Sequence, residues 1–161
     1  MTKFQRLFVF ITLALLPLHA LEKIVSVHAG GRLETRKRAY FTFFGITLPE
    51  ATASPEALPY LIQLLKGRSV RLSFERPGEK PDRAGAFAAY VDFVCDTCAE
   101  AKVTSAGNTM DFSTPLIPVQ ELLLQQGFAQ TDTAVAFSKR SYYLYLQKKA
   151  QKEGVGMWAP R

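Results

Sequence analysis

The order of strand-like and helix-like segments is the feature of this sequence that most constrains its fold. A strand pattern is a segment in which apolar and polar residues alternate or in which β-branched and aromatic residues gather. Three strand patterns come first, a helix pattern follows, and two more strand patterns come after it. Two more helix patterns end the chain. The strand patterns cover residues 24–27, 32–35, 39–46, 69–74 and 87–94, and the helix patterns cover residues 59–66, 118–126 and 138–153.

This order differs from the strand–helix alternation that is typical of parallel sheets. It predicts an α+β fold that is mainly a β-barrel, namely a five-stranded oligonucleotide/oligosaccharide-binding (OB) barrel with about three helices. The chain has 161 residues, 48% hydrophobic and 21% charged, which suits one globular domain and argues against a disordered or coiled-coil chain. In the last helix pattern Tyr142, Tyr145 and Leu146 share one face, which predicts that they pack against the barrel.

Residues 1–20 have the layout of a secretory signal peptide. Lys3 and Arg6 precede an apolar run, residues 7–18, and Ala20 supplies a small residue at a cleavage point. The run is short for a transmembrane helix, which needs about 20 residues. We therefore expect a signal peptide at residues 1–20 and one domain at residues 21–161, exported to the periplasm or secreted, with no stable membrane span after cleavage. An uncleaved anchor or a buried first helix is the alternative.

Five segments resemble motifs of a known family. Residues 45–51 (GITLPEA) resemble the segment GIDAPE of the staphylococcal nuclease, or thermonuclease-like, family, and residues 61–70 (LIQLLKGRSV) resemble its helix and the LLxGKxV motif that follows. Residues 82–91, 119–129 and 150–158 resemble three further motifs, in the family's order. The resemblance implies a five-stranded barrel with three helices. For typical members it also implies calcium-dependent hydrolysis of phosphodiester bonds in DNA and RNA.

The functional positions that the resemblance implies are mostly altered here. The turn that contains Gly30 has no carboxylate where the family has its first metal-binding acid, and Thr47 replaces the second. Thr42 and Ala86 stand where the family has two phosphate-binding arginines. Glu50 matches the catalytic glutamate. The resemblance therefore implies one retained position, Glu50, and degenerate positions at Gly30, Thr42, Thr47 and Ala86.

These replacements remove the groups that phosphodiester cleavage needs. A hard cation needs several oxygen ligands, and the charge that develops on phosphate needs fixed cationic donors. Losing one such donor typically costs about 10²–10³ in rate. We therefore expect a catalytically degenerate domain with no metal and no cofactor, in which Glu50 has a structural role. The alternative is an active calcium-dependent phosphodiesterase whose rearranged site around Glu50 recruits Glu34, Glu79, Asp82 or Arg83.

A cluster of basic residues indicates what the domain could bind. The formal net charge is +6, and the densest basic cluster consists of Arg32, Arg36, Lys37 and Arg38, close in sequence to Tyr40 and Phe41. Cations beside aromatic rings are typical of surfaces that bind single-stranded nucleic acid. The alternative is a solvated hairpin tip that keeps the sheet edge from aggregating. The expected partner is nucleic acid or a protein of the cell envelope, and the sequence assigns no oligomeric state.

The two cysteines are Cys95 and Cys98. In an exported protein an even cysteine number favours a disulfide, so we expect a local bond in an insertion between the fourth and fifth strands. Free thiols are one alternative. A redox or metal role is the other, although a zinc site would need two further ligands.

Overall fold

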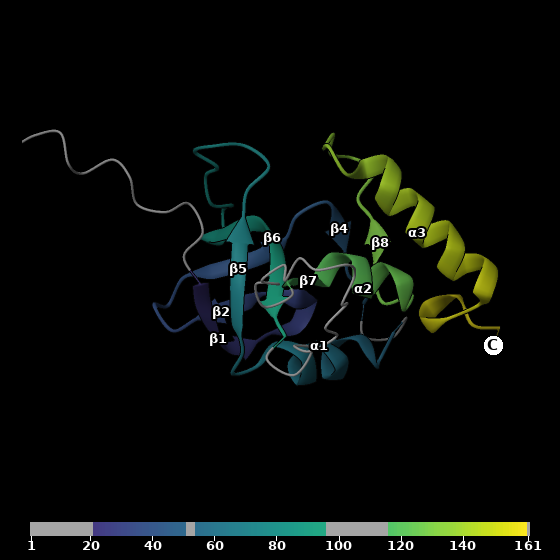
Figure 1. Cartoon of the computed structure of the whole chain (residues 1–161), viewed down its shortest axis with the longest axis horizontal. Coiled ribbons are helices and arrows are strands. Elements are labelled where there is room, and N and C mark those ends of the chain that lie inside the picture. The colour runs from purple at the N-terminus through teal and green to yellow at the C-terminus, as the bar shows by residue number, and fades with distance from the viewer. Residues whose placement is uncertain (1–20, 51–53, 96–115, 161) are drawn as a thin grey trace, which may run out of the picture.

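The computed structural model describes residues 21–50, 54–95 and 116–160 (Figure 1). Five of its strands form a closed barrel. They are β1 (Leu21–Val27), β2 (Leu33–Thr35), β3 (Tyr40–Phe43), β5 (Ser69–Ser73) and β6 (Ala86–Val94). Neighbouring strands are antiparallel except that β3 runs parallel to β6, and this last pairing closes the barrel. The predicted five-stranded barrel is confirmed.

Three helices of the described part of the chain cover the barrel, also as predicted. They are α1 (Ala57–Leu65), α2 (Val119–Gln125) and α3 (Arg140–Glu153). In Figure 1, α1 lies below the barrel and α2 lies between the barrel and α3. Their buried side chains join those of the strands in one hydrophobic core. Short elements connect these parts: the 3₁₀ turns η1 (Ala29–Gly31) and η2 (Gly156–Trp158), and the strands β4 (Ile46–Thr47), β7 (Leu116–Pro118) and β8 (Gln130–Thr131).

The predicted third strand, residues 39–46, is wrong in its extent. In the structure β3 ends at Phe43, and Ile46 and Thr47 form the separate strand β4, which pairs with β8. Gly45 makes the break because its φ of 77° is left-handed, and a side chain there would overlap the ring of Phe137. Gly45 is therefore a local signal for the break, whereas the contact that excludes a side chain there comes from Phe137, far away in the sequence.

The predicted packing of Tyr142 and Tyr145 is also wrong. Their exposed fractions are 45% and 62%, and their rings stack on each other at the surface, 6.5 Å apart. Tyr143, Leu146 and Ala150 form the buried face of α3 instead. The buried face of α3 is therefore shifted by about one residue from the predicted face, and only Leu146 belongs to both faces.

The segment after Val94 follows the fifth barrel strand, β6, and precedes β7, which pairs back onto β6. The predicted position of this segment, between the fourth and fifth strands, is therefore wrong. Cys95 is buried at the end of β6, whereas Cys98 lies outside the described residues, so their disulfide stays a prediction.

The predicted signal peptide, residues 1–20, also lies outside the described residues. No helix among the described residues is long and apolar enough to cross a membrane.

Candidate functional site

Gly30 and Glu50 line the same cavity, which also borders α1. The turn after β1 and the loop after β4 enclose, together with α1, a cavity of about 520 Å³. Glu50 is exposed at its rim, and apolar side chains make most of the lining. The lining residues are Ala29, Gly30, Gly31, Leu48, Pro49, Glu50, Ser54, Pro55, Ala57, Leu58, Pro59 and Leu61. Among them Glu50 supplies the carboxylate.

Thr42, Thr47 and Ala86 do not line this cavity. Thr42 and Ala86 lie on the parallel pair that closes the barrel, where Thr42 pairs with Ala88 and Ala86 pairs with Tyr40. Ala86 is 2% exposed. Thr47 is exposed on β4. The structure thus brings two of the sequence-predicted positions together around the cavity and leaves uncharged side chains at the other three.

The described residues around this cavity do not fit a calcium ion, since Glu50 is the one carboxylate among those that line it. Calcium takes six to eight oxygen ligands. Among the residues that the structure describes, no three His, Cys, Asp or Glu side chains are grouped so that they could hold a metal ion. Two of the acids considered as substitutes have other contacts: Asp82 accepts hydrogen bonds from the N–H groups of Ala84 and Ala86 at 2.8 and 2.9 Å, and Glu34 lies 3.2 Å from His28.

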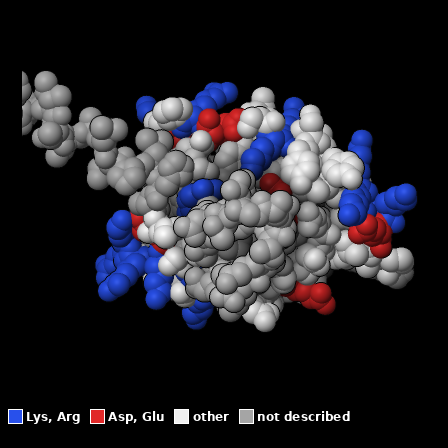
Figure 2. Space-filling view, viewed as in Figure 1, with Lys and Arg blue, Asp and Glu red and all other residues white. Residues whose placement is uncertain are grey.

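The basic cluster divides into two parts. Arg36, Lys37 and Arg38 are exposed at the tip of the β2–β3 hairpin. Figure 2 shows lysine and arginine side chains gathered at the left edge, where Figure 1 places this hairpin. The Lys37 Nζ atom lies 2.6 Å from a carboxylate oxygen of Glu22, so that charge is already paired. Arg32 is half-buried and contacts Tyr40 and Ala84 on the barrel wall.

Perturbed titratable groups gather where α3 meets the barrel. The Glu75 carboxylate accepts hydrogen bonds from the Tyr90 hydroxyl at 2.6 Å and from the N–H and hydroxyl of Ser138 at 2.7 and 3.0 Å. The bond from Tyr90 is the main cause that lowers the pKa of Glu75, while burial, followed by this bond, raises the pKa of Tyr90. Three donors satisfy the carboxylate, so we interpret the cluster as an anchor for α3.

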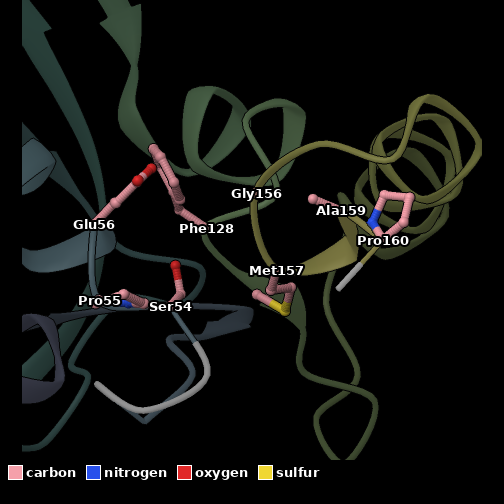
Figure 3. A pocket seen from close by; sticks show the side chains of 8 residues that line it. All are labelled: Ser54, Pro55, Glu56, Phe128, Gly156, Met157, Ala159 and Pro160. Atoms are coloured by element: carbon pink, nitrogen blue, oxygen red, sulfur yellow. The ribbon is translucent and has the colours of Figure 1, made fainter.

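A second cavity, of about 320 Å³, was not foreseen from the sequence (Figure 3). In this view Met157 lies between residues 54–56 and the C-terminal Ala159 and Pro160. The walls of this second cavity come from three distant parts of the chain, so no local sequence pattern predicts the cavity. The lining residues are Ser54, Pro55, Glu56, Phe128, Gly156, Met157, Ala159 and Pro160.

Comparison with protein families supports the same assignment as the fold. The family model described as staphylococcal nuclease homologue matches residues 43–160, from the end of β3 to the C-terminal turn. A comparison with curated proteins found no match. The match covers most of the chain, and the closed five-stranded barrel with three helices agrees with it. The chain therefore belongs to the family of staphylococcal nuclease homologues.

Proposed function

We propose that this chain is an exported, catalytically degenerate member of its family that binds nucleic acid without cleaving it. The observation that carries the proposal is the uncharged chemistry of Thr42, Thr47 and Ala86, combined with a single carboxylate, Glu50, at the cavity rim. The family supports nucleic acid as the partner in general. Export rests on the signal-like pattern of residues 1–20.

Binding and cleavage have different chemical requirements. Cleavage needs a held cation and fixed donors around the reacting phosphate, and uncharged side chains at the altered positions supply neither. Binding needs only positive charge near the backbone phosphates, because it is driven largely by the release of counterions. The net charge is +6 for the whole sequence and +4 once residues 1–20, with Lys3 and Arg6, are removed, and this excess together with the two parts of the basic cluster supplies that charge.

The test compares binding and cleavage in one preparation. Purified protein is mixed with fluorescent single-stranded and double-stranded DNA and RNA, with calcium or with a chelator. Anisotropy measures binding and gel electrophoresis measures cleavage. We expect affinity in the range of about 10⁻⁴–10⁻⁶ M, falling as salt rises, and equal background cleavage in wild type and Glu50→Ala.

Two outcomes contradict the proposal. If wild type cleaves only with calcium and Glu50→Ala abolishes the cleavage, the domain is an active nuclease with a rearranged site. If wild type binds none of the four nucleic acids at low salt, nucleic acid is not its partner. The N-terminal sequence of protein recovered from the culture medium or periplasm tests export separately: a start near Leu21 is expected, and retention in the cytoplasm contradicts this part.

A further inference from the structure

We propose that Arg32, held against the ring of Tyr40, is the residue that contacts a backbone phosphate when nucleic acid binds. This inference rests on the proposed function. Of the basic cluster, Arg32 on the barrel wall is the preorganised side chain that contributes most to affinity, and the exposed residues of the hairpin tip contribute less.

Two contacts fix the guanidinium group of Arg32. Its central carbon lies 4.0 Å from the centroid of the Tyr40 ring, which is a close cation–π distance. Its Nη2 atom donates a hydrogen bond of 2.9 Å to the carbonyl oxygen of Ala84, in the turn before β6. Tyr40 is itself held by pairing with Ala86 in the barrel wall. Arg32 is therefore positioned by β2, β3 and the turn that leads into β6.

Both contacts leave the charge of Arg32 unbalanced. The ring and the carbonyl group are uncharged, and none of the ion pairs among the described residues includes Arg32. The Glu34 carboxylate, two residues along the chain, contacts Nε2 of His28 at 3.2 Å. The Asp82 carboxylate accepts backbone N–H groups of its own turn. An anionic ligand therefore stabilises this partly buried, unpaired cation more than it would stabilise a cation that already has an anionic partner.

The remaining donors suit a phosphate group. Nε of Arg32 is enclosed and out of reach of a ligand. The donors that remain are the two N–H groups of Nη1, which makes no hydrogen bond with the described residues, and the second N–H of Nη2. A guanidinium group carries five N–H donors in a planar fork, a geometry that matches two oxygens of a phosphodiester. The ring beneath it keeps the fork in place before a ligand binds.

The side chains at the hairpin tip are also cationic, but they are not held in place as Arg32 is. Arg36, Lys37 and Arg38 are exposed, and Lys37 is paired with Glu22 at 2.6 Å. Exposed side chains lose rotamer freedom when they bind, which offsets part of their attraction to phosphate. Arg32 has already lost most of this freedom in the free protein. We therefore expect Arg32 to contribute more affinity than any single tip residue.

The test compares matched arginine substitutions in the whole protein, with single-stranded DNA as the probe. We expect Arg32→Ala to weaken binding about tenfold and to lower the slope of log affinity against log salt by about one. Arg36→Ala, which removes the same charge from the tip, should weaken binding about twofold. Arg32→Lys keeps the charge but loses the fork, so its affinity should lie near that of Arg32→Ala.

Tyr40→Leu removes the ring that holds Arg32 and should reproduce most of the loss seen with Arg32→Ala. Thermal unfolding followed by circular dichroism checks whether each variant is folded. If Arg32→Ala does not fold, Arg32→Lys serves as the test in its place. If Arg32→Ala and Arg36→Ala weaken binding equally, or if Arg32→Lys binds like wild type, this inference is wrong while the proposed function stands. If wild type itself binds no DNA, the proposed function fails and this inference fails with it.

Discussion

At the scale of single residues, Gln120 joins α2 to the barrel through its side chain. The residue is 1% exposed, its Oε1 atom accepts a 3.1 Å hydrogen bond from the N–H of Val91, and its Nε2 atom donates a 2.9 Å bond to the carbonyl of Ala89. Gln120→Leu fills the same space but removes the side-chain partner of the Val91 N–H, whereas the Ala89 carbonyl keeps a 3.0 Å hydrogen bond from the N–H of Phe44. Because one unsatisfied buried group costs about 1–3 kcal/mol, we expect the free energy of unfolding to fall by about 1–3 kcal/mol.

Urea denaturation measures this change, and Gln125→Leu is the matched control. Gln125 is exposed on the same helix, so its replacement should alter the free energy of unfolding by less than about 0.5 kcal/mol. Equal stability of the two variants would show that the two hydrogen bonds contribute nothing measurable.

At the scale of elements, the C-terminal turn η2 packs directly on the end of α2. Gly156 has a left-handed φ of 59°, and a side chain there would overlap the carbonyl oxygens of Gln126 and Gly127. Met157 donates a 3.0 Å hydrogen bond to Gly127, so the two backbones cannot separate without losing it. Gly156→Ala should therefore cost about 1–2 kcal/mol for its φ and about 1–3 kcal/mol for the overlap.

Gly67→Ala separates the two contributions. Gly67 is also left-handed, with a φ of 81°, but nothing lies within 4 Å of the position that a side chain would take. Its replacement should show the conformational cost alone, about 1–2 kcal/mol. If thermal unfolding midpoints of the two variants coincide, the overlap at Gly156 adds no measurable cost and this prediction is wrong.

At the scale of the whole molecule, the Glu75 carboxylate links the barrel to the start of α3. Its hydrogen bonds from Tyr90 and Ser138 lower its pKa in the folded protein below the ordinary value of 4.5. A carboxyl group with a lowered folded pKa contributes stability that is present above the unfolded pKa and is lost as pH falls through the folded pKa. The stability difference between wild type and Glu75→Gln should therefore be large at pH 7 and shrink below pH about 4.

Denaturation midpoints of both proteins at several pH values between about 3 and 7 check this expectation. Ser141→Ala is the control, because Ser141 is exposed on α3 and takes no part in the anchor. A difference between wild type and Glu75→Gln that stays constant over this range would contradict a role for the ionised carboxylate.

The order of elements follows from the sequence because the signals for them are local. Alternation of apolar and polar residues marks the strands, and glycine and proline mark their ends, so the barrel with three helices could be predicted. Gly45 is a local signal for the break at the end of β3, but the contact with Phe137, which excludes a side chain at Gly45, exists only when the chain is folded. The burial of Tyr143 in place of Tyr142 and Tyr145 likewise depends on how α3 is rotated against α2 and the barrel.

The candidate site divides in the same way. The residue types at positions 30, 42, 47, 50 and 86 are properties of the sequence, and so is the chemistry that they lack. Their placement is a property of the fold, which puts Gly30 and Glu50 at one cavity and Thr42 and Ala86 on the barrel wall. Sequence proximity grouped Arg32 with the hairpin tip. Only the tertiary structure separates it, because the pairing of β3 with β6 brings Tyr40 and the turn at Ala84 to the same side chain.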